Sequence, residues 1–175
     1  MKTELYLTMM LAATVLALTN EHVTVTFDDK GCVTSLRERA TSRELVSAGA
    51  FVGISLEKCG FLGADRAELK DGRLVFGFPG DFGSLAMKVE PFEGGWTFVL
   101  ESVDVPKAKR VFVGRLCPSF GTYFGTRANM VSDGASAVCL RPYDLHAAMA
   151  CTKGFLFASV EAGRAAGARV GLAAG

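Results

Sequence analysis

The sequence predicts an all-β protein, an antiparallel β-sandwich, and three observations lead to this fold class. Short runs alternate apolar with polar residues, and turn signals built from Gly, Asp and Ser recur between them. A helical period is hard to follow over more than about ten residues anywhere after the N-terminal segment. The 20 glycines and the hydrophobic content of 50% suit a compact fold with many tight turns and exclude disorder.

The clearest element is a β-hairpin near the N-terminus. Residues 22–27 (HVTVTF) alternate apolar and polar side chains, DDKG supplies a tight turn, and residues 32–38 (CVTSLRE) resume the alternation. Gly31 stands where such a turn needs a positive φ. The next segment, residues 37–45 (RERATSREL), has helical propensity but also fits a turn between two strands, and both alternatives remain open.

Further strands follow at short spacing, as is typical of a sandwich or a barrel. They are expected in the following ranges: 50–58, 66–78, 85–103, 137–143, 154–162 and 168–175. Asp71-Gly72 and Gly94-Gly95 supply turns inside the second and third of these ranges.

Two regions depart from this pattern. Residues 106–137 lose the alternation, and residues 118–136 within them are rich in Gly, Ser, Asn and Asp with aromatic residues interleaved. We interpret residues 118–136 as a long ordered connection between strands, and loops of this length are usually functional or pack over a sheet end. Residues 144–154 fit either one short helix or another strand.

Residues 1–17 are predicted to be a secretory signal peptide. Lys2 supplies the positive start, residues 5–18 form an uncharged apolar run, and Val15 with Ala17 gives a small-residue cleavage site. The run is shorter than the ~20 residues of a spanning helix and no later window replaces it, so no transmembrane segment is expected in the mature chain. A buried N-terminal strand or helix is the alternative, and Glu4 argues against secretion.

The mature chain, residues 18–175, is then expected to be one β-sandwich domain of a secreted or periplasmic protein. Its last run, residues 168–175, stops in mid-pattern without a polar tail or a cap. We therefore expect the domain to be truncated at its C-terminal end. A domain whose final strand simply ends the chain is the alternative.

Charge and cysteine usage exclude several classes of function. The formal net charge is +1 with the charges scattered singly, so no basic patch points to nucleic acid. The five cysteines form no C-x-x-C pair, and His22 and His146 lie far from a cysteine ligand pattern, so no metal site is expected. Most of these cysteines occupy apolar strand-like runs, which favours small buried side chains over a disulfide framework.

One motif resembles a known family. Residues 23–46 combine an acidic-Gly turn, a strand ending in Ser-Leu and a segment ending in Arg-Glu-Leu; the features are Asp28, Asp29, Gly31, Val33, Ser35, Leu36, Thr41, Arg43, Glu44 and Leu45. This pattern resembles the opening of the galactose-mutarotase-like β-sandwich that precedes the catalytic domain in many secreted bacterial glycoside hydrolases. Residues 123–145 and 156–175 resemble later strands of the same modules more loosely.

The resemblance implies a role beside a catalytic domain. In such enzymes the sandwich packs on a downstream (β/α) barrel, shapes its mouth and in some cases contacts glycan, while the catalytic carboxylates lie in the barrel. No barrel sequence is present, and no pair among the 18 acidic residues is marked out as catalytic. Stand-alone mutarotases of this fold use a Glu base and a His acid, but the flanks of His22 and His146 do not support that role. No catalytic residue and no cofactor is therefore assigned.

Aromatic and polar residues in the weakly patterned region are candidates for contact with sugars. Carbohydrate sites stack apolar sugar faces on exposed aromatic rings and bind hydroxyls with a few placed polar groups. The candidates are Tyr123, Phe124, Arg127, Asn129, Asp133, Tyr143, Asp144 and Trp96. The alternative is that the aromatic residues pack over the sandwich end, that Asp133 starts a turn, and that Trp96 belongs to the core or a domain interface.

Two hypotheses of function follow. The first is an accessory, non-catalytic sandwich of an exported glycoside hydrolase, whose partners are a downstream catalytic domain of the same polypeptide and a poly- or oligosaccharide. It requires an exposed apolar face for the partner domain. The second is a complete small secreted protein that binds carbohydrate or another surface partner. An epimerase-like sugar enzyme ranks last.

Overall fold

The computed structural model describes residues 6–10, 15–57, 60–121, 123–125, 128–144, 146–151 and 154–175. As the sequence predicts, the fold is all-β, with antiparallel strands packed in two layers. Helical structure in the described ranges is limited to one 3-10 turn, η1 (Ala162–Arg164). None of it has the length and apolar character needed to cross a membrane.

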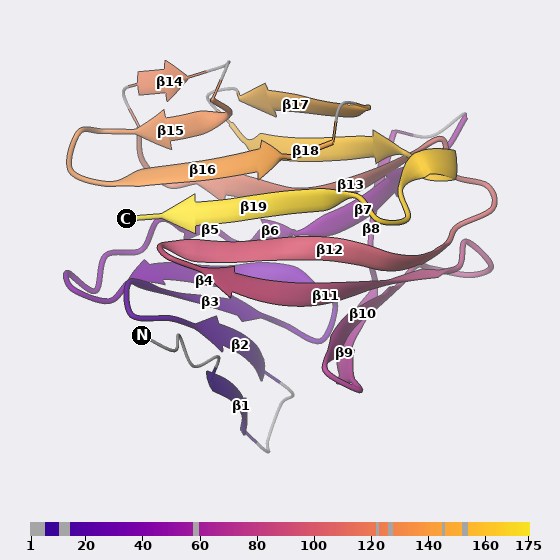
Figure 1. Cartoon of the computed structure of the whole chain (residues 1–175), viewed down its shortest axis with the longest axis horizontal. Coiled ribbons are helices and arrows are strands. Elements are labelled where there is room, and N and C mark those ends of the chain that lie inside the picture. Colours follow the sequence, from indigo (N-terminus) through magenta and orange to yellow (C-terminus); the bar gives the residue numbers. More distant parts are fainter. Residues whose placement is uncertain are drawn as a thin grey trace.

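The first layer is an eight-stranded sheet, here called the large sheet, which lies across the front of Figure 1. In spatial order its strands are β14 (Tyr123–Gly125), β15 (Met130–Ser132), β16 (Ala137–Pro142), β19 (Arg169–Ala174), β12 (Gly95–Asp104), β11 (Ser84–Phe92), β10 (Arg73–Gly77) and β9 (Arg66–Lys70). The last strand in sequence, β19, therefore lies between β12 and β16.

The second layer consists of two sheets joined by short strands. The six-stranded sheet has the path β17 (Ala147–Cys151), β18 (Leu156–Glu161), β13 (Arg110–Pro118), β7 (Val52–Ser55) and β8 (Phe61–Gly63), and β5 (Val46–Ser47) pairs with β13 off this path. The five-stranded sheet has the order β1 (Tyr6–Met10), β2 (Val15–Thr19), β3 (Val23–Phe27), β4 (Cys32–Glu38) and β6 (Gly49–Ala50).

The core lies between the two layers and is centred on aromatic rings. Phe51, which follows β6, contacts Phe27 of the five-stranded sheet at 5.1 Å and Phe98 of the large sheet at 5.0 Å between ring centroids. Both pairs are edge-to-face, the arrangement that the ring quadrupoles favour. All three side chains are fully buried. One residue between two short strands thus ties both layers to a common core.

The predicted hairpin is confirmed as β3 and β4. Asp28 Oδ1 accepts hydrogen bonds from the backbone nitrogens of Lys30 at 3.0 Å and Cys32 at 2.8 Å, which closes the turn. Gly31 has φ +75°, and a Cβ there would lie 2.7 Å from the ring of Phe76. The turn therefore needs glycine both for its backbone conformation and for its contact with the large sheet.

The motif that resembles the mutarotase-like sandwich has a structural basis. Glu44 Oε1 accepts a hydrogen bond from the backbone nitrogen of Leu36 at 2.7 Å, and its Oε2 accepts one from Ser35 Oγ at 2.6 Å. Leu36 and Leu45 are fully buried. Residues 39–42 form the turn between these partners, so the non-helical alternative for this segment is correct. The part of the motif around Glu44, Ser35 and Leu36 thus holds the hairpin to the segment that follows it.

Residues 106–137 are more regular than the sequence predicts, and the strands β14 and β15 correct the interpretation of residues 118–136 as one long connection. They contain β13, a nine-residue strand that pairs with β7 and β18, as well as β14 and β15. A register shift between Val113 and Leu116 interrupts the period of two and hides β13 from pattern analysis. Residues 147–151 form β17, so the strand alternative for residues 144–154 is correct. The third turn comes one residue earlier than expected, since β12 begins at Gly95.

The segment predicted as a signal peptide contains strands in its described part. β1 pairs with β2, and β2 pairs with β3. Leu16 and Leu18 are 5% and 1% exposed and join the core. Residues 1–5 and 11–14 lie outside the described residues. Cleavage after Ala17 would remove β1 and three of the five residues of β2 from the sheet edge, and this cleavage stays a prediction.

Candidate functional site

The outer face of the six-stranded sheet carries a cluster of phenylalanines. Phe112 of β13 lies between Phe61 of β8 and Phe157 of β18, with ring centroids 5.4 Å apart in both pairs. Phe155 stacks on Phe157 at 5.7 Å. The two residues that flank Phe112 are buried in the core, so alternation places this cluster on the side that faces away from the large sheet.

Arg115 lies over the same cluster. Its Cζ atom is 4.9 Å from the ring centroid of Phe61 and 5.3 Å from that of Phe155, both within cation–π range. Within the described residues Arg115 forms no ion pair with a carboxylate. We call Arg115 and the four rings of Phe61, Phe112, Phe155 and Phe157 the aromatic surface.

A glycine gives Phe61 room to lie flat on the sheet. Phe61 is 38% exposed although it contacts Phe112. A Cβ at Gly53 of β7 would collide with the Phe61 ring and would lie 2.8 Å from the backbone oxygen of Leu62. The aromatic surface thus depends on the absence of a side chain at Gly53.

The outer face of the large sheet is more polar. Tyr143 follows β16, is 55% exposed and lies over Gly171 of β19, where a Cβ would be 2.8 Å from the Tyr143 hydroxyl oxygen. Glu90 accepts from Lys88 Nζ at 3.1 Å and from Arg169 Nη2 at 2.7 Å. These cations, Lys88 first, lower the pKa of Glu90. Charges on this part of the face are therefore paired.

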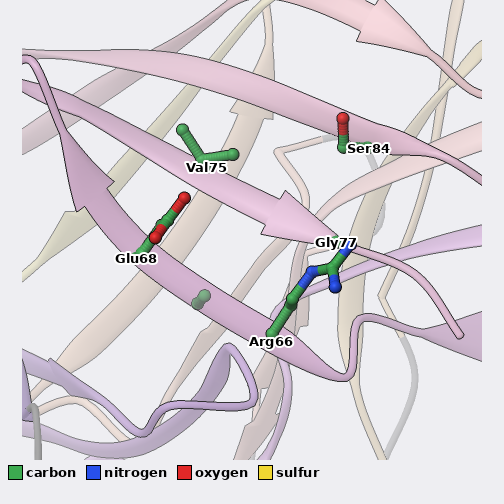
Figure 2. A pocket seen from close by; sticks show the side chains of 6 residues that line it. Arg66, Glu68, Val75, Gly77 and Ser84 are labelled. Carbon is green, nitrogen blue, oxygen red and sulfur yellow. The ribbon is translucent and has the colours of Figure 1, made fainter.

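A hollow of about 430 Å³ lies on the same face, at β9, β10 and the start of β11. Figure 2 shows its lining from Arg66, Glu68, Val75, Gly77 and Ser84. Gly77 is the register partner of both Arg66 and Ser84, and Val75 is the partner of Glu68. Neither Arg66 nor Glu68 forms a side-chain hydrogen bond or an ion pair among the described residues.

The structure gives Asp133 a structural partner. Its carboxylate forms an ion pair with Arg43, and its Oδ1 accepts from the backbone nitrogens of Ala135 and Ser136, both at 3.0 Å. The hydrogen bond from Arg43 and those from the turn lower the pKa of Asp133 to about 2. Arg43 also stacks on Phe120, with its Cζ 4.9 Å from the ring centroid. Asp133 thus joins the turn after β15 to the second layer.

Two further predicted sugar contacts lie in the interior. Trp96 is fully buried in the core. Asn129 is also fully buried, and its Nδ2 donates to the backbone oxygens of Leu140 at 2.6 Å and Phe157 at 3.1 Å, which links β16 to β18 across the layers. Neither side chain faces solvent in this chain.

The remaining candidates do not gather at one place. Asp144 Oδ1 accepts from the backbone nitrogen of His146 at 2.7 Å in the turn that precedes β17. Asp133 precedes β16, whereas Tyr143 and Asp144 follow it, so they lie at opposite ends of this strand. Tyr123 and Phe124 belong to the backbone of β14, but their side chains and all of Arg127 lie outside the described residues.

The cysteines are free where the structure describes them. Cys32, Cys117 and Cys139 are half-buried and Cys151 is buried, and none of the four forms a disulfide. Burial raises the pKa of the thiols of Cys32, Cys139 and Cys151, which disfavours the reactive thiolate. This agrees with the prediction of small apolar side chains. Cys59 lies outside the described residues, and within the described part no group of His, Cys, Asp and Glu has the arrangement of a metal site.

Sequence reasoning missed Arg66, Glu68 and the aromatic surface. Arg66 and Glu68 alternate with apolar residues in β9, which is the ordinary pattern of a solvent-facing strand. Phe112 and Arg115 lie in β13, where the alternation of apolar and polar residues is too weak to predict a strand face. The closely spaced Phe155 and Phe157 were the sequence signal that could have drawn attention to this face.

Comparison of the sequence with protein-family models and with curated proteins finds no match. Among solved structures, a 4-alpha-glucanotransferase from Thermococcus litoralis is similar with a TM-score of 0.47 and 8% sequence identity. The alignment covers 99% of this chain and 39% of that chain. A similarity of this size carries no conclusion about this chain.

Proposed function

We propose that this chain is an accessory, non-catalytic β-sandwich domain of an exported glycoside hydrolase, and that it supports a downstream catalytic barrel of the same polypeptide. The observation that carries the proposal is the aromatic surface on the six-stranded sheet. The resemblance of residues 23–46 to the opening of such modules adds the carbohydrate-active context. In this proposal the protein is secreted or periplasmic.

The aromatic surface has the composition of an interface centre. Aromatic residues and arginine are enriched where protein surfaces are fully desolvated on binding, and contiguous exposed apolar patches mark docking sites. Arg115 supplies a cation amid the rings, and no carboxylate among the described residues pairs with it. The matching surface on the downstream domain is therefore expected to present apolar side chains around a carboxylate. This carboxylate would form an ion pair with Arg115.

The test begins with the intact mass of the native gene product from the exported fraction. A mass well above 18.5 kDa is expected, since the proposal needs a downstream domain. In that full product, Phe112→Asp is expected to separate one cooperative thermal transition into two, because a buried carboxylate at the interface centre would break docking. Val99→Asp on the outer face of the large sheet is the matched control and is expected to keep the transitions coupled.

Two results would overturn this proposal. The first is a native product no larger than this chain. The second is a full-length product in which Phe112→Asp and Val99→Asp leave domain coupling equally intact.

A second candidate function is a stand-alone carbohydrate-binding protein. Tyr143 favours it, because its half-exposed ring lies flat on the outer face of the large sheet where a sugar ring can stack. Loss of glycan binding on Tyr143→Ala in a monomeric native product of this size would support it. A flat calorimetric response across a broad panel of oligosaccharides would remove it.

A further inference from the structure

We propose that the hollow at β9, β10 and β11 binds a saccharide that carries a carboxylate, a uronate residue, with Arg66 on the carboxylate and Glu68 on the hydroxyls. This inference rests on the proposed carbohydrate role and adds a substrate class and a site to it. The site differs from every residue that the sequence nominated for sugar contact.

The side chain of Arg66 lies across the neighbouring strand. A Cβ at Gly77 would collide with Arg66 Nε and lie 2.8 Å from its Cγ, so the side chain lies flat over β10. Figure 2 shows its guanidinium beside Gly77 and directed toward Ser84. Since a guanidinium presents parallel N–H donors, its preferred ligand is a carboxylate or another planar anion.

Other charged side chains on this face form ion pairs with each other, whereas Arg66 and Glu68 form none among the described residues. Arg73 pairs with Glu101, and Glu90 pairs with both Lys88 and Arg169. Arg66 and Glu68 lie two residues apart on one side of β9, so their Cα atoms are about 6.6 Å apart. Each nevertheless stays without a side-chain partner among the described residues and keeps its hydrogen-bonding capacity for a ligand.

The pair selects the chemistry of the ligand. A simple anion would satisfy Arg66 but would leave the carboxylate of Glu68 without a hydrogen-bond donor. A neutral sugar would donate its hydroxyl groups to Glu68 but would leave the guanidinium of Arg66 without an anion. A uronate meets both needs, because its carboxylate and its hydroxyls belong to one ring. Val75, which lies opposite Glu68 on β10, supplies an apolar patch beside this carboxylate for the C–H face of that ring.

The hollow has a suitable size and openness for such a residue. Its volume of about 430 Å³ lies within the usual range for small-molecule sites. Ser84 adds a hydroxyl at the end of the hollow toward which the guanidinium points. Because the hollow opens onto the outer face of the large sheet, the further residues of a longer saccharide can extend from the bound residue across that face.

The test titrates the 175-residue chain with glucuronate, glucose and acetate, followed by NMR chemical shifts. We expect glucuronate to shift signals of residues in β9 and β10, and to bind at least about tenfold more tightly than either glucose or acetate. Arg66→Gln and Gly77→Ala are expected to weaken glucuronate binding about tenfold. Lys70→Gln is the matched control, since it removes a cation from the same side of the same strand outside the hollow.

Several results would overturn the proposal. Equal binding of acetate and glucuronate would make the hollow an anion site without sugar selectivity. Equal effects of Arg66→Gln and Lys70→Gln would show charge attraction without a site. Sugar binding that survives Arg66→Gln but is lost with Tyr143→Ala would move the saccharide site elsewhere. None of these results touches domain coupling through Phe112, so the accessory-domain proposal would stand or fall separately.

Discussion

The two outer faces of the sandwich use one local arrangement and obtain opposite chemistry from it. On the six-stranded sheet the ring of Phe61 lies over Gly53 of the neighbouring strand. On the large sheet the guanidinium of Arg66 lies over Gly77 of the neighbouring strand. In each case the glycine leaves room for a long side chain to lie flat against the backbone. The side chain that crosses the glycine then decides whether the face is apolar or charged.

The difference lies in what surrounds each crossing side chain. Phe61 joins other rings and a cation that stacks on them, which produces a continuous surface suited to a protein partner. Arg66 has a carboxylate and a hydroxyl within the same hollow, which produces a concave site suited to a small ligand. Mutations at the glycines and at the crossing residues test this division directly.

The largest effect on stability is expected for Gly53→Ala. The added Cβ would displace the Phe61 ring and would meet the backbone oxygen of Leu62 at 2.8 Å, which cannot move without distorting β8. We expect the free energy of unfolding to fall by about 1–3 kcal/mol. Urea unfolding of the variant beside the parent measures it. A loss below about 0.5 kcal/mol would mean that the strand shifts freely and that Gly53 does not shape the face.

A smaller loss is expected for Phe112→Ala, the centre of the aromatic surface. Phe112 is half-buried and contacts the rings of Phe61 and Phe157, so truncation removes part of its buried area and both ring contacts. We expect about 1–2 kcal/mol in urea unfolding. Phe112→Leu keeps most of the apolar area and is expected to recover more than half of that loss. Identical values for the two variants would assign the rings no specific contribution.

A further test concerns the ion pair between Asp133 and Arg43, which joins the two layers of the sandwich. The folded-state pKa of Asp133 is about 2, below its ordinary value of 3.8, because Arg43 and two backbone N–H groups bind the carboxylate. The stabilising contribution is therefore complete above about pH 4 and is lost as the pH falls toward 2. Melting temperatures between pH 7 and pH 2 should drop less in Asp133→Asn than in the parent. Parallel curves for the two proteins would contradict this assignment.

The sequence predicted elements where side-chain period and turn chemistry agree. β3 and β4 combine a strict alternation with Asp28 and Gly31, whose roles in the turn can be inferred from residue type alone. β13 was missed because its register shift breaks the period and because two arginines occupy its outer side. A pattern analysis assigns arginines to loops or solvent, whereas Arg115 finds its partners in rings from other strands.

The candidate sites were less predictable than the fold for a related reason. Asp133 and Asn129 looked like ligand contacts in the sequence. Asp133 instead pairs with Arg43, which is far away in the sequence. Asn129 donates to the backbone oxygens of Leu140 and Phe157, which belong to strands in different layers. The hollow at Arg66 likewise requires the register of three strands, which brings Gly77 and Ser84 beside it. Composition along one strand holds no information about such neighbours.

The smallest effect on stability, and the sharpest test of the comparison, is expected for Gly77→Ala. The added Cβ would meet the flexible side chain of Arg66, which can swing into solvent, so the free energy of unfolding is expected to change by less than about 0.5 kcal/mol. The same methyl group at Gly53 meets the backbone and should cost several times more. Urea unfolding of both variants measures this contrast, with Gly163→Ala in η1 as a check on the effect of a methyl group that meets no neighbouring atom. A cost at Gly77 equal to that at Gly53 would show that Arg66 is as firmly packed as Phe61, and the hollow would then be part of the fold's support instead of a site held open for a ligand.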